Sequence, residues 1–100
     1  MLKLFISQPM RGRTDKEIMD TRQEILEEVK VTMGEDVELI DSFFKNAPAD
    51  ASPLWYLGQS ILLLATADVV YFAKGWREAR GCVIENICAN EYNLLCIQTS

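Results

Sequence analysis

Short apolar segments that alternate with segments of helical character limit the fold of this sequence more than any other feature. The apolar segments lie at residues 2–7, 37–40, 68–73 and 94–98, and each has the length of a buried strand. The first is followed by Pro9, whose nitrogen cannot donate a hydrogen bond to a neighbouring strand. The pattern therefore predicts four short strands with a different kind of element between them.

Helix signals occupy the three intervals between these segments. Residues 14–17 have the spacing of a capping box, and apolar residues then recur at helical spacing until Gly34. Ser52 precedes a proline at the start of a second predicted helix over residues 54–66, and a third helix is predicted over residues 81–92. Strand and helix therefore alternate along the whole chain.

This alternation predicts an α/β protein with a Rossmann-like or flavodoxin-like fold of three layers. Right-handed crossovers between successive strands require a four-stranded, mostly parallel sheet with helices on both faces. One hundred residues suffice for one core, so residues 1–100 are expected to form a single domain. In a doubly wound order the first and third strands are central neighbours, and a ligand binds beyond their carboxyl ends. The loops at Gln8 and Lys74 are therefore expected to line a crevice.

Charge and hydropathy exclude several classes of protein. Hydrophobic residues make up 49% and charged residues 25% of the chain, as in ordinary globular domains. The net charge of −5 and the pI near 4.6 argue against nucleic-acid polymers and anionic membrane surfaces as partners. The most apolar stretch, residues 61–73, is interrupted by Asp68 and is too short to span a membrane. A single nucleotide is still a compatible ligand, because one phosphate needs only a few local donors.

Several side chains common in hydrolases and metal sites are missing. The sequence has no histidine, which excludes Ser-His and Cys-His catalytic systems and the commonest metal ligand. Cys82, Cys88 and Cys96 are odd in number and form no CxxC pair, so neither a disulfide scaffold nor a zinc site is expected. No metal or cofactor is therefore predicted. Reduced thiols and the absence of a leader-like segment point to the cytoplasm.

The loop between the first strand and the first helix is the first candidate site. It combines a proline, a glycine and two arginines directly before a helix N-terminus, where backbone N–H groups and the helix dipole favour an anion. The same charges also suit a solvated turn that complements Asp15 and Glu17. The candidate substrate-binding residues of this loop are Ser7, Gln8, Pro9, Met10, Arg11 and Arg13.

Glu85 is the second candidate, because it lies four residues after Gly81 and close to the start of the third predicted helix. A carboxylate at that end of the crevice can attack an anomeric carbon or bind sugar hydroxyls. The alternative is an ordinary solvated charge on a helix face. Gly81 and Cys82 are expected to border the same site, with Cys82 as either a small packing residue or a thiol of lowered pKa.

Aromatic residues near the predicted loops form the third candidate, because a planar base can stack on them. Tyr71 and Phe72 lie inside the third strand and are expected in the core, whereas Trp76 beyond the strand end is expected to line the pocket. Trp55 and Tyr56 suit either a pocket or a subunit interface. The candidate substrate-binding residues after the third strand are Lys74, Gly75 and Trp76.

Three segments, taken in this order, resemble the nucleoside 2-deoxyribosyltransferase superfamily. They are residues 5–13 (Phe-Ile-Ser-Gln-Pro-Met-Arg-Gly-Arg), residues 67–70 (Ala-Asp-Val-Val) and residues 81–85 (Gly-Cys-Val-Ile-Glu). The chain is most similar to the small, phage- and bacteria-associated members of the DUF4406 type. The resemblance implies a Rossmann-like domain that binds a nucleoside or nucleoside monophosphate. It also implies cleavage of the N-glycosidic bond through a covalent glycosyl intermediate, with Glu85 matching the nucleophile.

The sequence departs from these enzymes at three positions. They carry a tyrosine in the first strand and a proton-handling aspartate on the second helix, where this chain has Phe5 and Ser60. Ser60 is also a candidate substrate-binding residue. The transferases also carry an aspartate six residues before the nucleophile, and its replacement by Ala79 argues against the transferase branch. Protonation of a leaving base is worth roughly two to four orders of magnitude in rate. Activity would therefore need another acid, from Asp41 or from a neighbouring subunit.

Three functions are compatible with these observations. The first is an N-glycosidase or deoxyribosyltransferase in which Glu85 is the nucleophile and, as the resemblance implies, Arg11 or Arg13 lies near a 5′-phosphate. The second is a catalytically weak module that binds or sequesters a nucleotide. The third is an interaction protein in which the apolar residues of 54–64 bury a subunit interface. A homodimer or larger homo-oligomer is expected in each case.

Overall fold

The computed structural model describes residues 1–44 and 47–98, and its helices and strands alternate as the sequence predicts. A short 3-10 helix, η1, lies between the third strand and the third α-helix. The elements in chain order are β1 (Leu2–Ser7), α1 (Asp15–Met33), β2 (Val37–Leu39), α2 (Pro53–Leu64), β3 (Val69–Phe72), η1 (Trp76–Glu78), α3 (Arg80–Glu91) and β4 (Leu95–Gln98).

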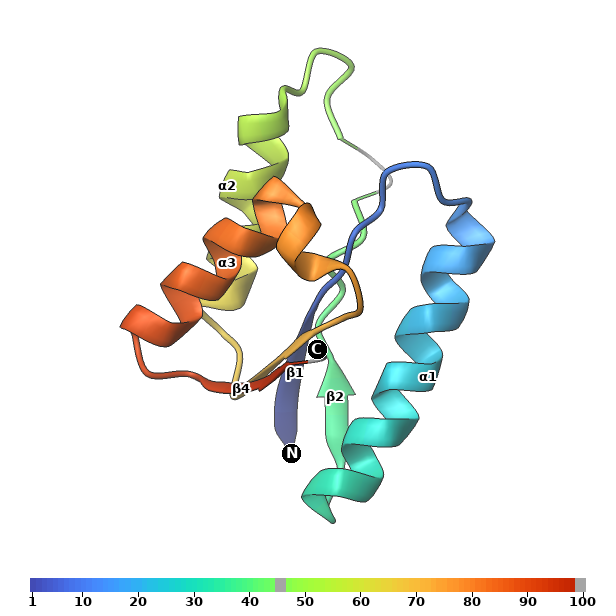
Figure 1. Cartoon of the computed structure of the whole chain (residues 1–100), viewed down its shortest axis with the longest axis vertical. Helices are drawn as coiled ribbons and strands as arrows, with labels where there is room; N and C mark the ends of the chain where they lie inside the picture. The colour runs from blue at the N-terminus through green and yellow to red at the C-terminus, as the bar shows by residue number, and fades with distance from the viewer. Residues whose placement is uncertain (45–46, 99–100) are drawn as a thin grey trace.

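The four strands form one parallel sheet in the order β2-β1-β3-β4. Leu4 of β1 aligns with Leu39 of β2 on one side and with Val69 of β3 on the other. α1 covers one face of the sheet, while α2 and α3 cover the opposite face (Figure 1). The predicted α/β class, the three layers and the central pair of first and third strands are confirmed.

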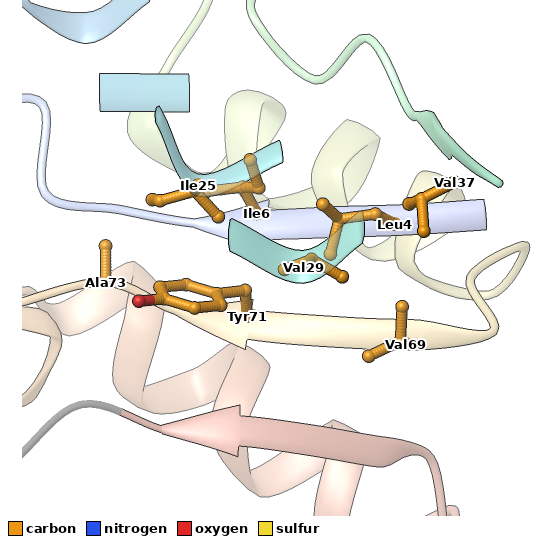
Figure 2. Packing of buried hydrophobic residues seen from close by; sticks show 8 residues of the cluster. All are labelled: Leu4, Ile6, Ile25, Val29, Val37, Val69, Tyr71 and Ala73. Atoms are coloured by element: carbon orange, nitrogen blue, oxygen red, sulfur yellow. The ribbon is translucent and has the colours of Figure 1, made fainter. Parts of the chain in front are cut away.

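Successive side chains of β1 point to opposite faces of the sheet and therefore belong to two separate core clusters. Leu4 and Ile6 point to the face that α1 covers, where they pack in the first cluster (Figure 2). Phe5 lies between them and belongs to the second cluster, on the side of α2 and α3. Because successive strand residues point to opposite faces, Ser7 follows the direction of Phe5 and Gln8 follows that of Ile6.

The predicted helix starts and stops are formed by the residues that signalled them. The Thr14 hydroxyl accepts a hydrogen bond from the Glu17 N–H, and the Glu17 carboxylate accepts one from the Thr14 N–H, which completes the capping box. Gly34 ends α1 in the left-handed conformation, with φ of 67°. Ser52 accepts a hydrogen bond from the Trp55 N–H and caps α2. Local chemistry therefore sets these boundaries.

The observed bounds differ from the predicted ones by one or two residues at an element end, and only η1 lacks a sequence prediction. Gly75 precedes η1 with φ of 86°, a conformation that favours glycine. The turn that it makes brings the Trp76 ring to 5.3 Å from the Phe72 ring, between centroids. Within residues 1–44 and 47–98, no helix is long and apolar enough to cross a membrane.

Candidate functional site

A cleft of about 1070 Å³ opens at the carboxyl end of β1. Typical small-molecule sites occupy roughly 300–1,000 Å³, so the cleft has room for a ligand of nucleotide size. The loop after β1 and the first turns of α2 and α3 lie at the same end of the molecule, at the top of Figure 1. The apolar part of the lining includes Phe5, Met10, Pro53, Leu54, Leu57 and Ile84.

Glu85 lies in the wall of this cleft, with only 6% of its surface exposed. The Ser7 hydroxyl donates a hydrogen bond of 2.7 Å to Glu85 Oε1. Burial raises the pKa of the Glu85 carboxyl, and hydrogen bonds from Ser7 and Ser60 oppose that shift because they favour the charged form. The alternative of a solvated charge on a helix face is therefore wrong. Glu85 is a buried carboxyl held by hydroxyl groups from two other elements.

Cys82 lies beside this carboxyl and acts as a packing residue. Burial is the largest effect on its thiol and raises the pKa. The Glu85 charge also raises this pKa, while a hydrogen bond with Ser7 opposes the shift. The side chain packs in the second core cluster with Phe5 and Phe72. A thiol whose pKa is raised carries little thiolate near neutral pH, so Cys82 is not activated as a nucleophile.

Most of the residues predicted from the sequence meet at the cleft. They come from segments far apart in the chain, and the parallel pairing of β1 with β3 is what brings the loop after β1 close to the start of α3. The predicted site residues found in the lining are Ser7, Gln8, Pro9, Met10, Arg11, Ser60, Gly81, Cys82 and Glu85.

The other predicted site residues lie outside the lining, and for them the prediction is corrected. Trp76 is 7% exposed and packs in the second core cluster, because its large apolar ring gains more free energy against Phe72 than in a solvated pocket. The left-handed turn at Gly75 directs Trp76 inward and leaves Lys74 exposed. Arg13 is also exposed, beyond the part of the loop that reaches the cleft.

The N-terminal turns of α1 and α3 differ in what they offer an anion. In α1 the capping box occupies the N–H groups of Thr14 and Glu17, and Asp15 and Glu17 add negative charge to the first turn. In α3 the N-cap residue Ala79 makes no side-chain hydrogen bond, and no acidic residue lies in the first turn. Arg80 and Gly81 of that turn line the cleft. The first turn of α3 therefore offers both backbone donors and a cation to a bound anion.

Arg22 of α1 is a buried cation that the sequence pattern did not single out. It is 2% exposed and donates hydrogen bonds to Gln8 Oε1 at 3.3 Å and to the Ile40 carbonyl oxygen at 2.9 Å. A signal was present, because Ile18 and Ile25 define the buried stripe of α1 and position 22 falls between them on that stripe. Lining residues that the pattern did not predict include Ser42, Leu57 and Arg80.

Glu85 is the only carboxyl side chain that lines the cleft in the part of the chain that the structure describes. Phe5 and Ser60 both reach the cleft, at the positions where the resemblance leads us to expect a tyrosine and an aspartate. Asp41, the candidate replacement acid, is not in the lining. Among the described residues, no group of three or more His, Cys, Asp and Glu side chains gathers to hold a metal ion.

Comparison of the chain with protein-family models, with curated proteins and with solved structures finds no match. The resemblance to nucleoside 2-deoxyribosyltransferases therefore stays a prediction from three short segments. The function has to be argued from the cleft and from the groups that face it.

Proposed function

We propose that this protein binds a nucleoside or nucleoside monophosphate in the cleft at the carboxyl end of β1. The observation that carries the proposal is the buried Glu85 carboxyl, which Ser7 holds in the wall of a cleft of about 1070 Å³. A carboxylate in that position can accept hydrogen bonds from sugar hydroxyls, and the mainly apolar lining suits the faces of a base.

The free thiols of all three cysteines support a reducing compartment, the cytoplasm.

The distribution of cations supports a ligand with a 5′-phosphate. The chain carries a net charge of −5, yet Arg11 and Arg80 both line the cleft, next to the uncapped first turn of α3. These donors suit one phosphate without attracting a polyanion. Tyr56 also reaches the lining and contacts Trp55 edge to face, with ring centroids 5.1 Å apart, which offers an aromatic surface to a base.

Cleavage of an N-glycosidic bond is a second candidate function, favoured by the same carboxyl. In this reaction the Glu85 carboxylate attacks C1′ and forms a C–O bond, while the C1′–N bond breaks and its electron pair leaves with the base. The leaving base takes a proton from solvent. Water or a second base then attacks C1′ and loses a proton, while the C–O bond between C1′ and Glu85 breaks and restores the carboxylate. Because no second carboxyl among the described residues lines the cleft, binding has stronger support than turnover.

We also propose that the chain associates with itself. Self-association would accompany ligand binding or, in an interaction protein, would be the main role. Leu54 and Leu62 of α2 are 76% and 65% exposed, and Ile87 of α3 is 55% exposed. Exposed large apolar side chains on neighbouring helices suit an interface. A second copy of the chain would cover them.

Calorimetric titration with common nucleosides and 5′-monophosphates tests the binding proposal. We expect at least one monophosphate to bind, and we expect Arg11→Ala to weaken its affinity by about tenfold, through loss of a charge-assisted hydrogen bond. Arg13→Ala is the matched control, because Arg13 belongs to the same loop and lies outside the lining. Absence of heat with every ligand, or equal losses in the two variants, would contradict the proposal.

Chromatography of the same mixtures separates binding from cleavage. Free base that accumulates with the parent protein and disappears with Glu85→Gln would establish the glycosidase. Tight binding without release of base would establish the binding module.

A further inference from the structure

Two buried polar groups in the cleft wall have no hydrogen-bond partner. Gln8 is 6% exposed and Ser42 is 4% exposed, and both residues line the cleft. Gln8 Nε2 and Ser42 Oγ make no hydrogen bond within the described part of the chain. Leaving such a group unpaired costs about 1–3 kcal/mol, and most buried polar groups in folded proteins are satisfied. A pair of them at one cleft wall indicates a place where a ligand supplies the partners.

Arg22 determines which end of the Gln8 amide faces the ligand. Its guanidinium donates to Gln8 Oε1 at 3.3 Å and to the Ile40 carbonyl oxygen at 2.9 Å. Because a guanidinium has donors only, the amide oxygen must face Arg22, and Nε2 is the end of the amide that Arg22 leaves without a partner. Gln8 and Ser42 therefore each bring one unpaired polar group to the wall of the cleft.

The charges around this pair favour a neutral acceptor. Gln8 and Ser42 are uncharged, and Arg22 is not in the lining. Asp41, adjacent to Ser42, interacts electrostatically with Arg22 and partly compensates its charge. The cations that do line the cleft, Arg11 and Arg80, belong to the loop after β1 and to the start of α3. An anionic group is better placed near them than beside Asp41.

The direction of side chains at the end of β1 separates this pair from Glu85. Ser7 points to the side of α2 and α3, where it holds Glu85, while Gln8 points to the side of α1, where it meets Arg22. A ligand whose sugar contacts Glu85 can therefore extend across the end of β1 and reach Gln8 with another part. For a nucleotide, the part that carries neutral acceptors is the base.

We propose that Gln8 and Ser42 form a base-recognition subsite, in which they donate hydrogen bonds to carbonyl oxygen or ring nitrogen acceptors on the edge of a nucleobase. This inference rests on the proposed function and adds the group that reads the base. Arg22 is a positioning residue in it, since it fixes the orientation of the Gln8 amide without contacting the ligand.

The test compares a ligand that has a base with one that lacks it. The affinity of the best-bound nucleoside 5′-monophosphate and of 2-deoxyribose 5-phosphate is measured by calorimetry for the parent protein, Gln8→Glu and Ser42→Ala. Gln8→Glu keeps the shape and the bond from Arg22 but turns an acceptor toward the base. We expect each variant to bind the nucleotide about tenfold more weakly, the effect of one buried hydrogen bond, and to bind the sugar phosphate as the parent does.

Gln23→Glu is the matched control, because it makes the same chemical change at an exposed position of α1. Ser42→Ala removes a single hydroxyl and serves as the deciding variant if Gln8→Glu alters the thermal unfolding of the protein. Unchanged nucleotide affinity in the variants, or equal losses for both ligands, would overturn the subsite while leaving the proposed function intact. Failure of the parent protein to bind either ligand would overturn both.

Discussion

Individual buried polar side chains are the groups from which the proposed function is argued. Glu85 and Ser7 meet on one side of β1, and Arg22 and Gln8 meet on the other side. A buried carboxyl and a buried guanidinium both carry a cost in free energy, because water no longer solvates their charges. Ser7, Gln8 and Glu85 line the cleft, and Arg22 holds Gln8 there. Together with the exposed Arg11 and Arg80 of the same lining, they are the candidates for function.

The Glu85 carboxyl should make the stability of the protein decrease as pH rises. Burial raises its pKa in the folded state above the ordinary value of 4.5, so the folded protein holds this proton more tightly than the unfolded chain does. The stabilising contribution is complete below pH 4.5 and is lost as pH rises through the raised pKa. We expect Glu85→Gln to raise the thermal unfolding temperature near neutral pH and to have a much smaller effect in acid.

Thermal unfolding recorded across this pH range checks the expectation. Glu24→Gln, on the exposed face of α1, is the matched control for the loss of one carboxylate. An equal shift of the unfolding temperature in the two variants at every pH would show that Glu85 does not have the buried role described here.

At the scale of the elements, the N-termini of α1 and α3 differ in their caps. The capping box of Thr14 and Glu17 caps the N-terminus of α1, whereas α3 begins without a side-chain cap. The two helices therefore differ in what they offer a ligand. The sequence pattern left the start of α1 open as either an anion site or a solvated turn.

Removal of the α1 cap should lower the stability of the domain by a measurable amount. Thr14→Ala leaves the Glu17 N–H without its acceptor, and the loss of an N-cap residue costs about 1 kcal/mol. The free energy of unfolding in urea measures this change. Thr32→Ala, exposed in the last turn of the same helix, is the control and should stay within about 0.5 kcal/mol of the parent. Equal stability of the two variants would contradict a stabilising role for the cap.

The whole molecule places its ligand cleft and its exposed apolar helix surface on the same side of the sheet. α2 contributes to both, because Leu54 and Tyr56 line the cleft while Leu62 is 65% exposed. A partner on this side would therefore lie close to the cleft. Self-association and ligand binding would then be coupled through one helix.

Substitution of Leu62 tests the proposed self-association. Burial of a leucine contributes about 1.5–3 kcal/mol, so Leu62→Glu should weaken association by at least about tenfold. Sedimentation at micromolar concentration measures the effect. Val31→Glu is the matched control, because Val31 is 83% exposed on α1, on the opposite face of the sheet. A parent protein that sediments as a monomer, or equal behaviour of the two variants, would contradict the proposal.

Local signals made most of the fold predictable from the sequence. The short apolar runs, the Thr14 capping box, Gly34 and the Ser52 cap act within one or two turns of the chain, so they indicate elements without knowledge of their neighbours. The order of strand and helix then limits the topology, because crossovers are right-handed. The meeting of Ser7 with Glu85 follows from that topology.

Tertiary structure decided the properties that depend on burial. Trp76 is in the core and not in the cleft, because the turn at Gly75 brings it onto Phe72. Arg22 is buried because Gln8 and a backbone carbonyl, both distant in the chain, receive its hydrogen bonds. The sequence by itself determined which elements form and in what order, since those signals are local. Which side chains face the cleft and which face the core depends on contacts between distant segments, and only the packed molecule specifies them.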